Sequence, residues 1–141
     1  MSRTRYVETS ALLRAIVESD AAVEQLLAEP ATPLVTSALT ILEASRTIAR
    51  ARRDGRLTTA SAREADRRVA SFERATDIRG IDDEVLHGAR QEFPFEPVRS
   101  LDAIHLATLR LFDREIGPLA VVSCDDRVRR NAAQLGFAVL P

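Results

Sequence analysis

The 141-residue sequence contains no Lys and no Trp, and it has a single Cys. Without Lys, the chain has no P-loop lysine, Schiff-base lysine or lysine general base. The lone Cys124 cannot form an internal disulfide, which predicts a reducing compartment such as the cytoplasm. No apolar run approaches the roughly 20 residues of a membrane span. These absences predict a cytoplasmic protein with no membrane partner.

The chain also lacks an excess of positive or negative charge. The 20 basic residues are all Arg and nearly balance 21 acidic residues, for a net charge of −1. Overall attraction to nucleic acid or membrane is therefore not expected, and any such binding needs a local patch. Hydrophobic residues make up 45% and charged residues 29%, as in globular proteins. The length predicts a single domain over residues 1–141.

Short apolar segments alternate with amphipathic segments along the chain. Strands are predicted at 5–7, 34–36, 76–78, 119–123 and 137–140. Helical patterns occupy 11–19, 21–28, 38–54, 58–74, 83–91, 101–114 and 127–135. The predicted helix N-caps include Ser10, Ser37, Asp82 and Ser100. This alternation predicts an α/β fold of three layers, with helices on both faces of a central parallel sheet.

Four acidic residues are candidates for a site at one edge of this sheet. Ligand sites in open parallel sheets lie at the carboxyl ends of strands, where Glu8 and Asp125 are predicted. Asp102 lies in the first turn of a helix, where the helix dipole favours a negative charge. Glu43 interrupts an apolar helical stretch and needs a partner there, because burying an unpaired carboxylate is costly.

The residue types of this set indicate a metal site. Carboxylates that converge without a counter-charge raise one another's pKa values. Oxygen donors without Cys or His suit a hard divalent cation, Mg²⁺ or Mn²⁺, rather than zinc. Such an ion activates water and stabilises charge on a phosphoryl group. The predicted reaction is phosphodiester hydrolysis.

Each acid also has an ordinary structural interpretation. Glu8 could be an exposed strand-end acid, Asp102 a partner of its helix dipole and Asp125 a turn residue. Glu43 could form an ion pair with an Arg one or two turns along its own helix. His105 lies one turn after Asp102 and could orient it, although a satisfied core histidine is the more common arrangement.

Several segments together resemble PIN domains, most closely those of the VapC-type ribonuclease toxins. The segments are Tyr6–Leu12, Glu43 within its helix, Leu101–Thr108 and Val122–Arg127. The resemblance implies that Asp102 and Glu8 are the principal metal ligands and that Glu43 and Asp125 complete a catalytic acidic quartet. Thr9, Ser10 and Ser123 match small hydroxyl positions that line such sites. The sequence departs from the family at Glu8, where PIN domains usually have Asp.

The resemblance also implies an activity and partners. It implies a Mg²⁺- or Mn²⁺-dependent endoribonuclease that hydrolyses RNA, is the toxin of a type II toxin–antitoxin pair, binds a VapB-type antitoxin and forms a homodimer. An alternative is a catalytically impaired PIN module that binds RNA or a protein partner. A third possibility is a generic α/β scaffold whose acids all serve as helix caps.

Arginines are concentrated in the middle of the chain. Between Arg46 and Arg74, nine Arg outnumber four acidic residues. Arg46, Arg50 and Arg53 share one helix face at three- and four-residue spacing. This face could follow a phosphate backbone beside the acidic site, or it could be an ordinary solvated surface.

Overall fold

The computed structural model describes residues 3–141, in which a five-stranded parallel sheet forms the central layer. The strands are β1 (Arg5–Val7), β2 (Leu34–Ser37), β3 (Asp77–Arg79), β4 (Ala120–Val122) and β5 (Ala138–Leu140). Their order across the sheet is β3-β2-β1-β4-β5. The predicted strands are confirmed, with differences of one or two residues at their ends.

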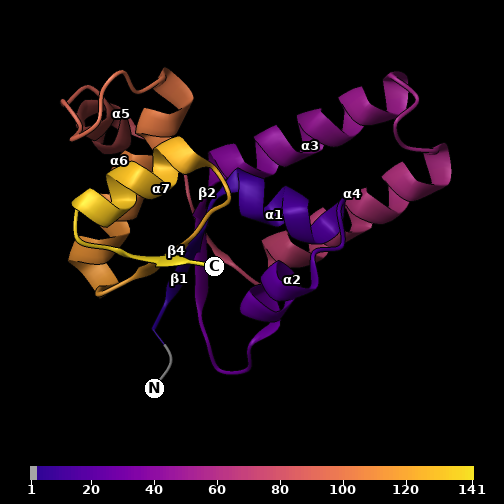
Figure 1. The fold of residues 1–141 in the computed structure, drawn as a ribbon, viewed down its shortest axis with the longest axis horizontal. Helices are drawn as coiled ribbons and strands as arrows, with labels where there is room; N and C mark the ends of the chain where they lie inside the picture. Colours follow the sequence, from indigo (N-terminus) through magenta and orange to yellow (C-terminus); the bar gives the residue numbers. More distant parts are fainter. Residues whose placement is uncertain (1–2) are drawn as a thin grey trace.

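Seven helices flank the sheet in the described part of the chain. They are α1 (Thr9–Ile16), α2 (Ala21–Ala28), α3 (Ala38–Arg53), α4 (Thr59–Arg74), α5 (Asp83–Ala89), α6 (Ser100–Ile116) and α7 (Asp126–Gln134). Helices α1 to α4 lie on one side of the sheet, and α5 to α7 lie on the other (Figure 1). This arrangement confirms the predicted three-layer α/β fold.

Side chains along the central strands alternate between the two faces of the sheet. Tyr6 and Val121 pack with Leu109 of α6 on one face. Val7 and Val122, the next residues in β1 and β4, pack with side chains of α1, α3 and α4 on the other face. Each large apolar side chain buried in this way stabilises the fold by about 1.5–3 kcal/mol. The short strands are therefore held by cores on both faces.

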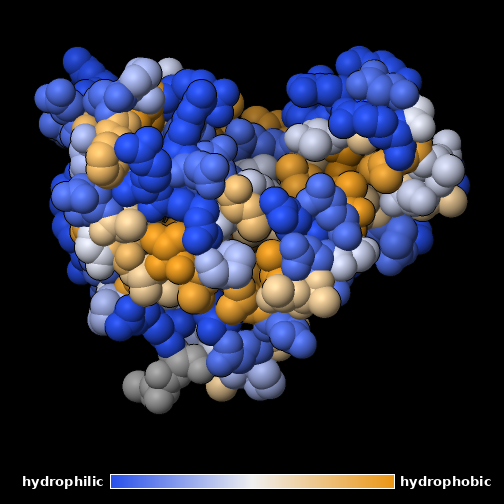
Figure 2. Space-filling model, viewed as in Figure 1, coloured by the Kyte–Doolittle hydropathy of each residue, from blue (hydrophilic) through white to orange (hydrophobic). Residues whose placement is uncertain are grey.

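Helices α3 and α4 pack side by side and extend away from the sheet (Figure 1). Ile48 of α3 and Val69 of α4 belong to the same buried cluster. The other side of α3 exposes Arg46, Arg50 and Arg53. The end of this helix farthest from the sheet is strongly hydrophilic (Figure 2). The predicted arginine face is thus present on the surface.

Two of the predicted helix caps are confirmed and two are wrong. Ser37 accepts a hydrogen bond from the Leu39 N–H, and Asp82 accepts one from the Val85 N–H. Ser10 is not the N-cap of α1, because the helix begins at Thr9 and the Glu8 carboxylate accepts the hydrogen bond from the Ser10 N–H. Ser100 lies inside α6, whose N-cap residue Arg99 makes no side-chain capping bond.

The topology identifies one place where a ligand site is expected. From β1, the strand order runs to β2 and β3 in one direction and to β4 and β5 in the other. A crevice forms at such a switch point beyond the carboxyl ends of the strands. Glu8 follows β1 and Asp125 lies shortly after β4, so both border this crevice. No helix among residues 3–141 is long and apolar enough to cross a membrane.

Candidate functional site

Glu8 joins the ends of the two central strands. Its Oε2 accepts a hydrogen bond from the Ser10 N–H at 2.7 Å, and this bond makes Glu8 the N-cap of α1. Its Oε1 accepts from the hydroxyls of Ser10 and Ser123, both at 2.6 Å. Glu8 is only 5% exposed. It is therefore buried with both oxygens hydrogen-bonded, not an exposed acid at a strand end. We call Glu8, Ser10 and Ser123 the strand-end cluster.

Asp125 is connected to this cluster through the backbone. The Asp125 N–H donates to Ser123 Oγ at 3.1 Å. Its carboxylate caps α7, because Oδ1 accepts from the N–H groups of Arg127 and Val128 at 2.9 and 3.2 Å. Ser123 thus lies between Glu8 and Asp125, and bonds to both.

Glu43 takes its partners from other elements and not from its own helix. Its Oε1 accepts a hydrogen bond from Thr9 Oγ1 at 2.6 Å and lies 2.7 Å from His105 Nε2. The other ring nitrogen, Nδ1, lies 2.8 Å from the Tyr6 hydroxyl. Because a carboxylate only accepts, Nε2 carries the proton, and Nδ1 of the neutral ring accepts from Tyr6. The ion pair expected along α3 is absent from the described residues.

His105 fixes the orientation and the charge of Glu43. Burial raises the pKa of the Glu43 carboxyl, but hydrogen bonds from His105 and Thr9 and the positive charge of Arg99 outweigh it. The pKa of Glu43 therefore lies below its ordinary value, and the group is ionised at neutral pH. Burial, together with the charges of Glu8 and Glu43, raises the pKa of Tyr6 well above its ordinary value. Tyr6 thus keeps its proton as a donor.

Asp102 lies in the first turn of α6, as predicted, but its side chain has a cationic partner. Arg99 Nε lies 3.3 Å from Asp102 Oδ2. The same guanidinium lowers the pKa of Glu43, so its charge acts on both carboxylates. The Asp102 side chain is 14% exposed, against 66% for Arg99. This pair is weak in energy because Arg99 is largely in solvent.

The four candidate acids are linked through Ser123, Thr9 and Arg99 but do not meet at one point. Among residues 3–141, no group of three or more His, Cys, Asp or Glu side chains is arranged to hold a metal ion. At Glu8, both carboxylate oxygens are directed to the N–H and hydroxyl of Ser10 and the hydroxyl of Ser123. Each of the other three acids has one carboxylate oxygen with no hydrogen bond from the described residues. The three acids are Glu43, Asp102 and Asp125.

The chemistry of this donor set fits a hard divalent cation. The set contains only carboxylate and hydroxyl oxygens, together with a histidine whose nitrogens are already bonded. Magnesium and manganese prefer such oxygen donors and often keep several water ligands. Three free carboxylate oxygens near one crevice could therefore hold an ion partly through water.

Sequence reasoning assigned no site role to two members of this network and identified a third as a buried histidine without its partner. Tyr6 was expected as a strand residue at the start of the Tyr6–Leu12 segment, without a role in the site, and Arg99 was not singled out. His105 is the buried core histidine that the alternative interpretation favoured, at 2% exposed, but it contacts Glu43 and not Asp102. Its position on the inner face of α6 indicated burial. Which acid His105 contacts depends on how α6 packs against α1 and α3.

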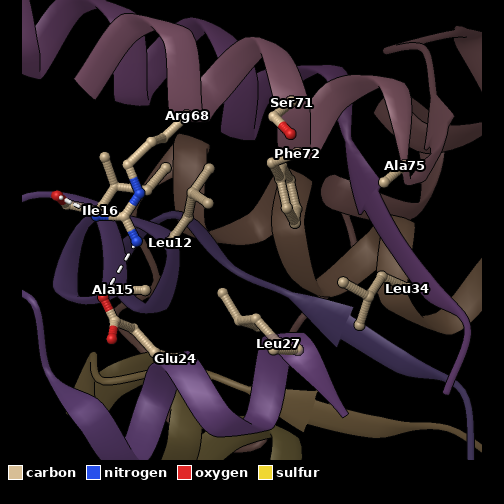
Figure 3. Close-up of a pocket in the computed structure, with 11 residues that line it drawn as sticks. Leu12, Ala15, Ile16, Glu24, Leu27, Leu34, Arg68, Ser71, Phe72 and Ala75 are labelled. Carbon is tan, nitrogen blue, oxygen red and sulfur yellow. Dashed lines mark hydrogen bonds and ion pairs between the residues drawn. The ribbon is translucent and has the colours of Figure 1, made fainter. Parts of the chain in front are cut away.

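A separate cavity of about 310 Å³ lies between α1, α2 and α4. Apolar side chains line it, and Leu12, Leu27 and Phe72 surround its centre (Figure 3). Arg68 forms an ion pair with Glu24 at its edge, with 3.1 Å between nitrogen and oxygen. None of the four candidate acids lines this cavity. It is therefore distinct from the predicted site.

Comparisons with known proteins agree with this fold. The family model of the PIN domain matches residues 5–134. Ribonuclease VapC35 of Mycobacterium tuberculosis is 36% identical over 139 residues, which cover 96% of this chain and 94% of the relative. This chain thus belongs to the PIN domain family, among its VapC-type members.

Solved structures show the same fold at low sequence identity. VapC20 of Mycobacterium tuberculosis, described as a sarcin–ricin loop cleaving toxin, has a TM-score of 0.65 at 18% identity. That match covers 98% of this chain and all of VapC20. A toxin–antitoxin complex from Klebsiella pneumoniae has a TM-score of 0.65 at 17% identity, with 98% and 97% of the two chains covered.

Proposed function

We propose that this protein is a metal-dependent endoribonuclease and the toxin of a type II toxin–antitoxin pair, built as one PIN-like domain over residues 1–141. The observation that carries the proposal is the 36% identity to a VapC ribonuclease over nearly the full length of both chains. The acidic crevice at the strand switch point supports it, because metal-dependent phosphodiester hydrolysis uses oxygen ligands that hold a divalent cation.

We propose that Glu8, Glu43, Asp102 and Asp125 are the catalytic acids and that they hold Mg²⁺ or Mn²⁺. Glu43, Asp102 and Asp125 each offer a free carboxylate oxygen, and Glu8 takes part by exchanging one of its serine partners for the ion. A divalent cation supplies an activated water and neutralises charge on the phosphoryl group. His105 and Thr9 keep Glu43 ionised and aimed by donating to its Oε1.

RNA would reach this crevice along cationic surface. Arg46, Arg50 and Arg53 are exposed on α3, the helix that carries Glu43. None of the three forms an ion pair with another described residue. Unpaired arginines are free to bind phosphate groups. We therefore assign this α3 face to the RNA backbone.

The proposed partners follow from the relatives. We propose a VapB-type antitoxin that covers the acidic crevice, because Leu42 and Leu101 are exposed beside Glu43 and Asp102 and provide apolar surface for it. We also propose a homodimer formed through helices, which light scattering of the purified chain would test. The protein would act in the cytoplasm, where Cys124 stays reduced.

The direct test is an RNA cleavage assay with Mn²⁺, with Mg²⁺ and with EDTA. The parent should cleave with at least one metal and not with EDTA, and Asp102→Asn should be inactive. Asp83→Asn is the matched control, because Asp83 also lies in the first turn of a helix and is exposed outside the crevice. Equal cleavage by the parent and Asp102→Asn would contradict the assignment.

The alternative of an impaired PIN module rests on a specific observation, the use of both Glu8 oxygens within the protein. In that case the parent would be inert with every metal, and Glu8→Asp would restore cleavage. RNA binding without cleavage by both proteins would leave a binding module.

A further inference from the structure

A second crevice lies beside the acidic site, between the 95–99 loop and α7. Its volume is about 440 Å³. Apolar groups of Phe95, Pro97 and Val98 form part of its wall. The remaining lining residues are Glu96, Arg99, Arg127, Arg130 and Asn131. We call this space the loop–α7 pocket.

The loop–α7 pocket is cationic. Arg127 and Arg130 are exposed, and neither forms an ion pair within residues 3–141. The single carboxylate of the pocket, Glu96, is occupied internally. Its two oxygens accept from the N–H groups of Phe93 and Val98 at 2.8 and 2.6 Å. Positive charge is thus left available to a ligand.

The pocket also presents a flat surface. The guanidinium carbon of Arg130 lies 4.4 Å from the centroid of the Phe95 ring. Phe95 remains 39% exposed, so part of its ring is accessible to a ligand. Aromatic rings and guanidinium planes are the two surfaces on which unpaired RNA bases stack.

A buried amide holds this surface in place. Asn131 is 1% exposed, and its Oδ1 accepts from the Phe95 N–H at 2.9 Å. Its Nδ2 donates to the carbonyls of Phe95 and Arg127 at 3.3 and 3.1 Å. These bonds hold both backbone groups of Phe95 in a fixed position. The pocket is therefore preorganised.

The pocket shares residues with the acidic site. Arg99 lines the pocket and also contacts Asp102. Arg127 lines it from the first turn of α7, and its backbone N–H binds Asp125. A strand whose phosphate lies at the acids would therefore continue directly into this pocket.

We propose that the loop–α7 pocket binds one unstacked nucleotide of single-stranded RNA next to the phosphate that is cleaved. Arg99 and Arg127 bind its phosphate, and its base stacks on the Phe95–Arg130 surface. This inference rests on the proposed function for the position of the scissile phosphate. An acidic protein segment has complementary charge, but it does not use a flat stacking surface.

Binding of a fluorescein-labelled, mixed-sequence RNA 12-mer to the full-length chain tests the proposal. Fluorescence anisotropy in EDTA over a KCl series measures affinity without cleavage. Arg127→Gln should weaken binding several-fold and reduce the magnitude of the salt slope by about 0.7. Phe95→Leu should weaken binding roughly tenfold and leave the salt slope unchanged, because stacking releases no counterions.

Arg110→Gln is the matched control, because Arg110 is an exposed arginine outside the pocket on α6. It should bind RNA as the parent does. The same RNA annealed to its complement should lose its dependence on Phe95. Melting temperatures equal to that of the parent would show that the variants are folded.

Three results would overturn the proposal. The first is parent-like RNA affinity in both Phe95→Leu and Arg127→Gln. The second is an equal loss in Arg110→Gln, which would indicate general charge attraction. The third is binding of a Glu-rich 12-residue peptide that depends on Phe95 while RNA binding does not. A parent that cleaves no RNA with any metal would refute the proposed function and leave this binding result unaffected.

Discussion

Replacing Glu8 by Gln removes the negative charge from the strand-end cluster and keeps the length of the side chain. The carboxylate accepts three hydrogen bonds in a buried site, and both of its oxygens are used. Gln has one acceptor oxygen, which can still accept from the Ser10 N–H. Its NH₂ group then replaces the carboxylate oxygen that accepted from the two serine hydroxyls. The two serine hydroxyls can rotate to accept from it, so the bonds change from charged to neutral pairs.

The magnitude follows from this exchange. A hydrogen bond to a charged group contributes about 1.5–3 kcal/mol and a neutral one about 0.5–1.5 kcal/mol. Relief of repulsion between Glu8 and the nearby acids offsets part of the loss. We expect Glu8→Gln to lower the free energy of unfolding by about 1–2 kcal/mol without metal. For a domain of this size, that corresponds to a fall in Tm of about 3–6 °C.

Thermal unfolding followed by circular dichroism in EDTA measures this change. Glu8→Asp is the control, because Asp keeps the charge and is a favoured N-cap residue. It should unfold within about 1 kcal/mol of the parent. A Glu8→Gln protein that unfolds at or above the melting temperature of the parent would refute the reasoning, since repulsion would then outweigh the three hydrogen bonds.

Four other changes test the site and the core. Glu8→Gln should abolish metal-dependent RNA cleavage while Glu8→Asp retains it, as measured by gel assay; full activity in Glu8→Gln would remove Glu8 from the catalytic acids. His105→Phe leaves the buried Tyr6 hydroxyl and the Glu43 carboxylate short of partners, so chemical denaturation should show a loss of about 2–4 kcal/mol. Leu109→Ala should cost about 3 kcal/mol in the same assay, because Leu109 is 1% exposed in the core; a loss below about 1 kcal/mol would contradict that packing. At 100 times its dissociation constant, Mn²⁺ should stabilise the parent by about 2.7 kcal/mol and should not stabilise Asp102→Asn; an equal shift in both would place the ion elsewhere.

Much of the architecture was readable from local pattern alone. Alternation of short apolar runs with amphipathic segments predicted the parallel sheet. A short apolar run is typical of a buried strand, and apolar residues at a helical period are typical of a helix with one buried face. Ser37 and Asp82 were identified as caps because capping is a contact between residues two or three apart. The positions of Glu8 and Asp125 at one edge of the sheet likewise follow from strand order and direction.

Tertiary packing decided which side chains form hydrogen bonds with one another in the site. Ser123 donates to the Glu8 carboxylate because β1 and β4 lie side by side, a contact between residues 115 positions apart. Nothing within one segment pairs Glu43 with His105, which lies 62 residues away, since that contact depends on how α3 and α6 pack. The sequence alone thus predicted an acidic site and placed it at the edge of the sheet where the strands end. The fold determined which oxygens are occupied, because hydrogen bonds between distant segments depend on three-dimensional distance.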